Sequence, residues 1–345
     1  MIPYIIFSIL LFVFYIKNSP LCMTILLVLF AVFRYDTGWD YMSYYNACTD
    51  YTALSIAQNA WGKVWSWWFE LMYDKKMPFV GIGVPALLTN LLIAISFKIL
   101  LGNDKQKLCE ALLIYGFWPF LYLQSFCVVR QFLAIGFSML GFAMFYKKKY
   151  MLSGASYVLA IMLHSSSLFA VIFPLFLILK KSLSFMQVLI VSVVVIVAFG
   201  GLITVLNSLG MVGYVELLES EDNFGGKIGF VYLALAMYLL ITIYKSKDRE
   251  SVESKLLSLF TICVIIQFFV YVAPVPSVVS RAILYGMIFM PICLGNSINI
   301  ARLSASKNLI YAIMMLFMFV YLMITEDSPG AVSQYVPYKT ILDLQ

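Results

Sequence analysis

Residues 78–100, PFVGIGVPALLTNLLIAISFKIL, decide the fold class, because Lys98 is the only charged residue among them. A helix needs about 20 apolar residues to cross a hydrocarbon core of about 30 Å. Comparable stretches recur along the whole chain of 345 residues, which is 63% hydrophobic and 12% charged. A soluble domain has about 45–50% apolar and about 25% charged residues. A helix can cross lipid because it forms its backbone hydrogen bonds internally. The sequence therefore predicts an all-α, polytopic membrane protein with no soluble domain.

On both sides of this stretch, apolar segments separated by short polar breaks predict a bundle of about twelve transmembrane helices, which forms one domain over residues 1–345. The helices are expected at about 2–16, 20–33, 78–100, 108–125, 127–146, 150–163, 166–179, 183–206, 228–244, 256–273, 281–300 and 308–324. The pair 150–163 and 166–179 is short for two full crossings. A re-entrant arrangement is the alternative for that pair.

The distribution of charge predicts the orientation of the bundle. Of the 23 Lys and Arg residues, fifteen fall in one alternating set of connections and six in the other, whereas the acidic residues number five and twelve. Lys and Arg are enriched in cytoplasmic loops. The sequence therefore predicts a bacterial inner-membrane protein with both termini in the periplasm. On this interpretation the net charge of +6 reflects topology, and no nucleic-acid partner is expected.

Three segments on the predicted outer side are polar or amphipathic. Residues 34–77 are rich in Trp and Tyr, which suit a membrane–water interface, and residues 54–73 predict a helix lying on the membrane surface. Residues 207–227 are expected to form an exposed acidic loop, and residues 325–345 a polar C-terminal tail.

Four residues near the predicted outer face are candidates for chemistry. Arg130 and Arg281 are flanked by apolar sequence near helix ends, Arg34 follows an apolar helix, and His164 is the only histidine. A charge at the centre of a membrane costs about 2.5–3.5 kcal/mol on insertion scales, so such residues usually have a functional reason. Guanidinium groups are planar, stay charged and bind phosphate in a bidentate way. We therefore expect Arg130 and Arg281 to bind a shared anionic ligand.

Each candidate also has a simpler interpretation. An arginine near a helix end can extend to lipid head groups, an alternative that weighs most for Arg34. A lone membrane histidine is more often a hydrogen-bonded packing residue than a catalytic one. Asp36, Asp40 and Asp50 can be solvated loop charges, and the tyrosines of residues 34–77 can form an aromatic belt.

Several motifs of other enzyme classes are missing from the sequence. It contains no Walker A loop, no GxSxG elbow, no CxxC pair and no His/Cys cluster with metal-ligand spacing, so no cofactor, metal or disulfide is predicted. Acidic residues are scarce within the predicted helices, which argues against an ion- or proton-coupled transporter.

Five short motifs occur in order along the chain. They are residues 33–45 (FRYDTGWDYMSYY), 130–134 (RQFLA), 164–166 (HSS), Ser280-Arg281 with Tyr285, and 335–338 (YVPY). Together they resemble the EpsG branch of the Wzy-type polysaccharide polymerases, whose first signature is Arg-x-x-x-Gly-x-Asp-Tyr-x-x-Tyr. Trp39 departs from the small polar residue that is commoner in the family, which bears on fine substrate preference.

The resemblance implies a GT-C-type fold, akin to lipid-linked-sugar glycosyltransferases and O-antigen ligases, that acts at the periplasmic face. Such enzymes join repeat units carried on undecaprenyl diphosphate into O-antigen, capsule or exopolysaccharide. The implied partners are undecaprenyl-diphosphate-linked oligosaccharides as donor and acceptor, membrane lipids, a chain-length regulator and a flippase. At the matching positions, the resemblance implies substrate binding by Arg34, Tyr41, Tyr44, Gln131, Tyr285 and Tyr338, and catalysis by Asp40, Arg130, His164 and Arg281.

These residues fit a metal-independent glycosyl transfer. Arg130 and Arg281 are expected to clamp the departing diphosphate, while either His164 or Asp40 removes the proton of the acceptor hydroxyl. Three other functions are weighed against polymerisation: an O-antigen ligase, a flippase or exporter of lipid-linked oligosaccharide, and a sugar acyltransferase. The longest outer segment comes early in the chain, which favours a polymerase over a ligase. The cations gather at one face, whereas a flippase needs them along a route across the membrane.

Overall fold

The computed structural model describes residues 1–208, 226–246, 248–272, 277–300, 306–326 and 335–343, and these are almost entirely helical. The all-α prediction is therefore confirmed. Contacts divide the chain into two compact units, Met1–Ser167 with Ser306–Gln345, and Leu168–Ala305. The organisation as one functional domain stays a prediction. Most of the predicted acidic loop 207–227 and residues 327–334 of the predicted tail lie outside the described residues.

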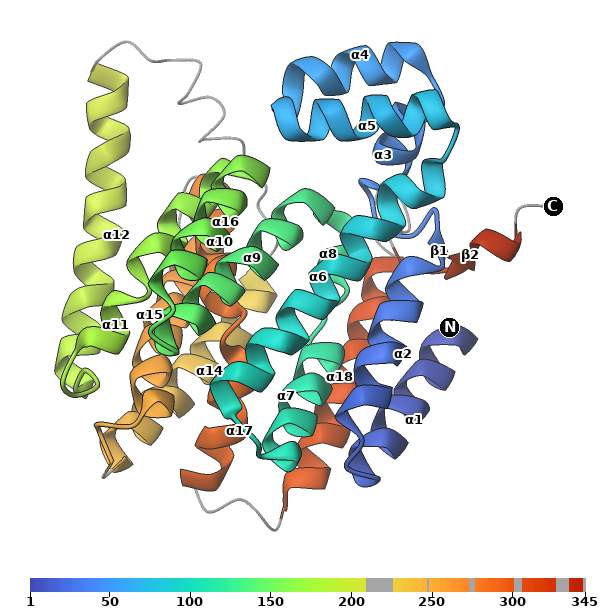
Figure 1. The fold of residues 1–345 in the computed structure, drawn as a ribbon. Coiled ribbons are helices and arrows are strands. Elements are labelled where there is room, and N and C mark those ends of the chain that lie inside the picture. Colours follow the sequence, from blue (N-terminus) through green and yellow to red (C-terminus); the bar gives the residue numbers. More distant parts are fainter. Residues whose placement is uncertain (209–225, 247, 273–276, 301–305, 327–334, 344–345) are drawn as a thin grey trace. The chain divides into compact units, whose positions relative to one another are not determined.

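The first unit contains both ends of the chain (Figure 1). Its elements are α1 (Ile2–Ile16), α2 (Pro20–Val32), β1 (Arg34–Tyr35), α3 (Tyr41–Ala47), α4 (Tyr51–Ala60), α5 (Lys63–Lys75), α6 (Pro78–Leu101), α7 (Lys105–Phe117), α8 (Gln124–Cys127), α9 (Val129–Tyr146), α10 (Tyr150–Leu163), α18 (Lys307–Glu326), β2 (Lys339–Thr340) and the 3-10 helix η3 (Ile341–Asp343). A second 3-10 helix, η1 (Ser165–Ile172), leads out of this unit.

The second unit is built from six helices within the described part of residues 168–305. They are α11 (Leu175–Ile178), α12 (Phe185–Ser208), α14 (Gly226–Lys245), α15 (Val252–Val272), α16 (Ser277–Met287) and α17 (Met290–Ile300). The central helix α15 is buried along most of its length and contacts α12, α14, α16 and α17.

Several described helices are suited to cross a membrane. Five are long and apolar enough, namely α6, α9, α15, residues 228–245 of α14 and residues 307–324 of α18. The pair α16 and α17 passes the same test together but is bent by 51°, and α1, α2 and α10 are shorter apolar helices. A multi-pass membrane protein is thus supported, whereas the count of about twelve crossings stays a prediction.

Two predicted helices have the wrong boundaries, because a glycine or a proline ends the helix earlier than expected. The surface helix expected at 54–73 is a hairpin of α4 and α5, because Gly62 at the turn has a φ of +85°. The helix expected at 108–125 ends at Phe117. Trp118 is extended there, since Pro119 follows it and disfavours helical backbone in the preceding residue.

Two further predicted helices are broken. Residues 166–179 do not form one α-helix, because the 3-10 helix η1 is followed by Pro174 and the short α11. A 3-10 segment of eight residues is longer than such segments usually are. The helix expected at 281–300 begins earlier, at Ser277, and bends between α16 and α17.

Contacts within each unit join connections that the charge distribution assigns to the same side of the membrane. In the first unit Lys307 at the start of α18 pairs with Glu110 of α7 at 2.8 Å, and Figure 1 shows these ends opposite to α3, α4 and α5. In the second unit Ser182 and Arg249 exchange two hydrogen bonds of 2.6 Å. All four residues belong to or adjoin connections of the predicted cytoplasmic set. The compartment itself stays a prediction.

The close packing of α15 and α16 gives a stability test in the second unit. A Cβ on Gly286 would lie far inside van der Waals contact with Cys263 Sγ. Gly286→Ala is therefore expected to destabilise the protein by about 1–3 kcal/mol, the usual cost of overpacking. Melting in detergent, followed by size-exclusion fluorescence, measures this loss. Adding Cys263→Ala should restore part of the melting temperature, and an unchanged Gly286→Ala protein would contradict the packing.

Candidate functional site

A small aromatic core fixes one end of the first unit. Helices α3, α4 and α5 pack on α6 and α9 through twelve buried side chains, namely Tyr41, Tyr44, Ala47, Cys48, Leu54, Ala57, Trp65, Phe69, Met72, Ile82, Val129 and Leu133. Burial of large aromatic side chains contributes strongly to the stability of such a core. The core therefore holds the α4–α5 hairpin against the beginning of α9, where two predicted site residues lie.

Arg130 lies in the first turn of α9 and contacts the turn of that hairpin. Its guanidinium carbon is 4.8 Å from the ring centroid of Trp61, and its Nη1 lies 3.5 Å from the Trp61 carbonyl oxygen. A cation over an indole face is worth about 0.5–2 kcal/mol. The Nε of Arg130 is buried and has no hydrogen-bond partner among the described residues. Trp61 thus orients the guanidinium of Arg130, and the binding of an anion by this group stays a prediction.

Asp40 and Tyr44 belong to the same electrostatic cluster as Arg130. The Tyr44 hydroxyl donates to Asp40 Oδ2 at 3.4 Å. Burial raises the pKa of Tyr44 and the Asp40 carboxylate raises it further, whereas the Arg130 charge lowers it. The net effect is upward, so Tyr44 remains a neutral donor at physiological pH. The Asp40 carboxylate and the Arg130 guanidinium therefore both interact with the hydroxyl of Tyr44.

His164 lies at the end of α10, next to a second anchor of the hairpin. Trp65 Nε1 donates to the carbonyl oxygen of Leu163 at 2.8 Å. The Nδ1 of His164 is 2.7 Å from Ser166 Oγ, at the start of η1. The backbone of His164 is extended, so the chain leaves the helix at this residue. The two tryptophans of the hairpin thus fix the positions of Arg130 and of the residue before His164.

Arg34 is buried, with only 1% of its surface exposed. It donates to the Ala31 carbonyl oxygen at the end of α2, and its guanidinium carbon lies 4.6 Å from the ring centroid of Phe126 and 5.8 Å from that of Tyr41. Burial lowers the pKa of Arg34, but an arginine still keeps its charge. Its Nε and Nη2 have no hydrogen-bond partner among the described residues.

The described C-terminal segment, residues 335–343, packs on the Arg34 motif and the helices beside it. β2 pairs antiparallel with β1, and Lys339 Nζ lies 2.6 Å from Asp36 Oδ2. The Tyr338 hydroxyl donates to the Phe30 carbonyl oxygen at 2.5 Å. Tyr335 is buried, with its hydroxyl 3.2 Å from Cys127 Sγ. Motifs from the two ends of the chain therefore form one structure.

A sequence model of the EpsG family matches residues 17–340, nearly the whole chain. The chain belongs to the EpsG family. Comparison with curated proteins gave no match, and neither did comparison with solved structures. The predicted resemblance is thus confirmed, and EpsG membership implies a function like that of exopolysaccharide or O-antigen polymerases.

The predicted site residues of this EpsG protein are divided between the two units. The first unit holds eight of them, namely Arg34, Asp40, Tyr41, Tyr44, Arg130, Gln131, His164 and Tyr338. Gln131 is buried beside Arg130, and Tyr44 stacks on Phe69 at 5.8 Å. The stacking of Tyr41 and Tyr44 on sugars stays a prediction.

The second unit of the EpsG protein holds the other two predicted site residues. Arg281 is exposed on α16, and Tyr285, one turn later, is buried. The shared clamp of Arg130 and Arg281 stays a prediction, because it requires a ligand that contacts both units.

Trp61 and Lys339 were not predicted to contact the site of this EpsG protein, and Ser166 was named only as part of the motif at 164–166. Trp61 contacts Arg130, Ser166 contacts His164, and Lys339 pairs with Asp36. Trp61 stood out only as one of many interfacial aromatics. The available signal was Gly62, since a glycine in an amphipathic stretch marks a turn that can bring its neighbours against another helix.

Proposed function

We propose that this protein is a polysaccharide polymerase that transfers a growing glycan from undecaprenyl diphosphate to a sugar hydroxyl of another undecaprenyl-diphosphate-linked repeat unit. The single observation that carries this proposal is the EpsG match over residues 17–340. The cluster of Arg130, Tyr44 and Asp40 supports it, because the reaction needs a cation for the leaving phosphate and a base for the acceptor. On this proposal, the site faces the periplasm.

The transfer exchanges one bond for another. The acceptor hydroxyl oxygen bonds to the anomeric carbon of the donor sugar while the bond from that carbon to the phosphate oxygen breaks. Undecaprenyl diphosphate leaves with the bonding electrons, and the hydroxyl proton passes to an enzyme base. Arg130, held by Trp61, stabilises the negative charge that develops on the leaving oxygen. Arg281 adds a second guanidinium to the same diphosphate.

The base is assigned to His164, with Asp40 as the alternative. For the neutral imidazole to accept a proton at Nε2, its Nδ1–H must donate to Ser166 Oγ, which lies 2.7 Å away. Ser166 then holds the required tautomer. Asp40 instead accepts from Tyr44, whose pKa the Arg130 charge lowers, which suits a role in orienting the tyrosine beside Arg130.

His164→Ala is expected to lower the rate of chain growth by about 10²–10⁴, because general base catalysis contributes that much. Ser166→Ala should lower it by less, since water can replace the hydroxyl. Ser156→Ala is the matched control, because Ser156 donates to the Leu152 carbonyl oxygen of its own helix, and this variant should leave chain length unchanged. Wild-type polymer from His164→Ala together with loss in Asp40→Asn would assign the base to Asp40.

A polysaccharide gel of a deletion strain tests the proposed function. Single repeat units attached to their final acceptor indicate a missing polymerase, because transfer of one unit still occurs. Absence of any attached unit would point to a ligase or a flippase, and full ladders with altered chemistry to an acyltransferase. Complementation with the wild-type chain should restore long chains.

A further inference from the structure

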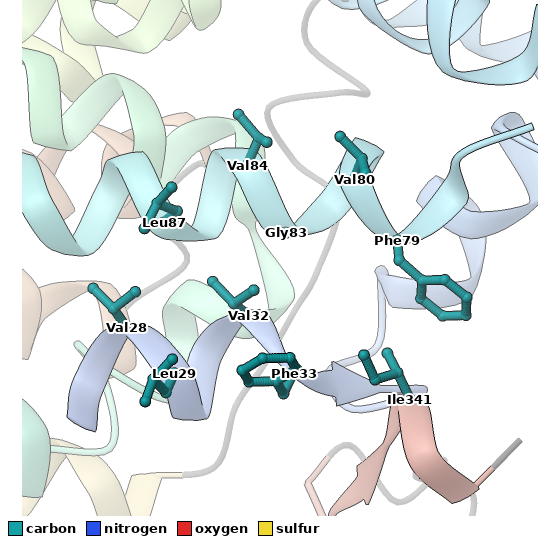
Figure 2. A pocket seen from close by; sticks show the side chains of 10 residues that line it. All are labelled: Val28, Leu29, Val32, Phe33, Phe79, Val80, Gly83, Val84, Leu87 and Ile341. Atoms are coloured by element: carbon teal, nitrogen blue, oxygen red, sulfur yellow. The ribbon is translucent and has the colours of Figure 1, made fainter. Parts of the chain in front are cut away.

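Arg34 is almost completely enclosed by the protein. Only 1% of its surface is exposed, and its Nε and Nη2 are buried without a hydrogen-bond partner among the described residues. The residue before it, Phe33, lines an apolar groove between α2 and α6 together with Phe79 and Ile341, as Figure 2 shows, but Arg34 does not line that groove. The guanidinium therefore presents almost no surface on which a substrate could bind.

The Arg34 side chain contacts three elements at once. Its Nη1 donates to the Ala31 carbonyl oxygen in the last turn of α2, where helix carbonyls lack partners of their own. Its guanidinium carbon lies 4.6 Å from the ring centroid of Phe126 in α8 and 5.8 Å from that of Tyr41 in α3. A cation is attracted to the face of an aromatic ring, most strongly where water is excluded. One side chain thus holds α3 and α8 against the end of α2.

The two short helices that Arg34 joins lead to the proposed catalytic cluster. Asp40 is the N-cap residue of α3, and Tyr44 lies one turn further along the same helix. Arg130 follows Phe126 by four residues, across the junction between α8 and the beginning of α9. The Tyr44 hydroxyl interacts with both the Asp40 carboxylate and the Arg130 guanidinium, so this interaction depends on how α3 and α8 are placed.

Phe126 is also contacted by the loop between β1 and α3. A Cβ on Gly38 would lie 2.5 Å from the Phe126 carbonyl oxygen, so the loop backbone lies directly against α8. The ring of the same phenylalanine faces the Arg34 guanidinium. In such close packing the loss of one side chain is felt by its neighbours. Loss of the Arg34 contact is therefore expected to displace α3 relative to the first turn of α9.

Stability alone does not explain an arginine at this position. Buried polar groups are nearly always hydrogen-bonded, and a buried charge is costly unless its partners are complete. A methionine would fill similar space without any nitrogen to satisfy, and it also packs well against aromatic rings. Natural proteins break such rules mainly at functional sites. The cation at residue 34 therefore has a functional reason, and its burial argues against direct binding of substrate.

We infer that Arg34 is a positioning residue that holds Asp40 and Tyr44 in place relative to Arg130, and that it does not contact the substrate. This inference rests on the proposed function, since that function gives the three residues a common task. It differs from the substrate-binding role that the family resemblance implies for Arg34. A displacement of about 1 Å at an active site can lower a rate by about 10²-fold, so the placement of the two helices matters for the reaction.

The fluorine resonance of a fluorotyrosine placed at position 44 tests the inference without requiring catalysis. This resonance depends on the surroundings of the ring, which include the Asp40 carboxylate and the Arg130 charge. In the full-length protein in nanodiscs, Arg34→Met is expected to shift the resonance toward its position in Arg130→Ala. The melting temperature should stay the same or rise, because the buried nitrogens without partners among the described residues are removed.

Lys339→Met is the matched control for the loss of charge. Lys339 pairs with Asp36 at 2.6 Å, so this variant removes a cation from the same motif and leaves Arg34 in place. It should leave the resonance at position 44 unchanged. A shift as large as that of Arg34→Met would show that net charge, rather than the contacts of Arg34, determines the surroundings of Tyr44, and would overturn the inference.

Chain growth by the reconstituted protein gives the second measurement. Arg34→Met should lower kcat by about 10²-fold while KM for the lipid-linked repeat unit changes by less than about twofold. Arg34→Lys should restore only part of kcat, since an ammonium has no planar face to pack on Phe126 and Tyr41. In an Arg130→Ala background, Arg34→Met should cause little further loss, because the residue that it positions is already missing.

Other results would overturn the inference as well. An unchanged resonance in Arg34→Met would show that Arg34 does not position Tyr44, and a raised KM with unchanged kcat would show that Arg34 binds the substrate. A shifted resonance with a melting temperature lowered as far as in Gly38→Ala would show a general loss of packing.

The resonance does not depend on the reaction, so the two proposals fail separately. A shifted resonance in Arg34→Met, together with a wild-type protein that forms no polymer, contradicts the proposed function alone. Polymer formation by the wild-type protein, together with an unchanged resonance in Arg34→Met, contradicts the inference alone.

Discussion

Arg130→Ala is expected to abolish long glycan chains while single repeat units still reach their acceptor. The guanidinium lies over Trp61, and on the proposed mechanism it stabilises the charge that develops on the leaving diphosphate. Loss of one group that stabilises developing charge typically lowers a rate by about 10²–10³. Gel analysis of polysaccharide from cells that express the variant at wild-type level measures the effect.

A lysine at position 130 distinguishes the effect of the positive charge from that of the planar guanidinium group. Arg130→Lys keeps the charge but loses the planar fork and its stacking on Trp61, so chains should remain short. Arg249→Ala is the control, because Arg249 bonds the Ser182 carbonyl oxygen in a connection of the predicted cytoplasmic set. Arg281→Ala should resemble Arg130→Ala. Normal chain lengths in both Arg130→Ala and Arg281→Ala would rule out the diphosphate clamp.

Gly38→Ala is expected to destabilise the first unit and to eliminate polymer. Gly38 has a φ of +97°, and a Cβ there would lie 2.5 Å from the Phe126 carbonyl oxygen. Backbone strain costs about 1–3 kcal/mol and overpacking about 1–3 kcal/mol, so the combined loss is on the order of 2–6 kcal/mol. The clash is with backbone, so a side-chain rotation cannot relieve it. The melting temperature in detergent reports the loss directly.

Gly62→Ala is the matched control for this effect. Gly62 also has a positive φ, of +85°, but nothing lies within 4 Å of the place that its Cβ would take. Its substitution by alanine therefore carries the strain without the clash and should lower the melting temperature less. Equal losses in the two variants would show that strain alone matters and that the Arg34 motif does not pack closely on α8.

Local sequence signals were sufficient for helices with clear ends. α1 and α10 have the predicted bounds, because Lys17-Asn18-Ser19-Pro20 and His164 interrupt the apolar runs abruptly. The bend in 281–300 was missed, since apolar composition continues across it. The break in 54–73 was missed although Gly62 marks it, because the mixed apolar and polar pattern of that stretch continues on both sides. Hydropathy indicates burial in lipid or protein but not backbone conformation. It therefore does not indicate a bend inside an apolar segment.

Single residues of the candidate site could also be predicted from the local sequence, whereas their contacts depend on the tertiary structure. Arg130 and His164 could be selected because charge and polarity are rare among apolar residues. Their partners could not, since Trp61 precedes Arg130 by 69 residues, and Trp65 precedes Leu163, the neighbour of His164, by 98. The pairing of Lys339 with Asp36 depends on the C-terminal segment reaching β1, which no local pattern predicts.

Reconstitution of the purified protein with a synthetic undecaprenyl-diphosphate-linked repeat unit tests whether the protein itself polymerises glycans. Glycans of two or more repeat units are expected to form on the lipid carrier, with one undecaprenyl diphosphate released for each new linkage, and Arg130→Ala should stop both. An unchanged single-repeat lipid, with no released carrier under conditions where the protein is folded, would contradict the proposed function.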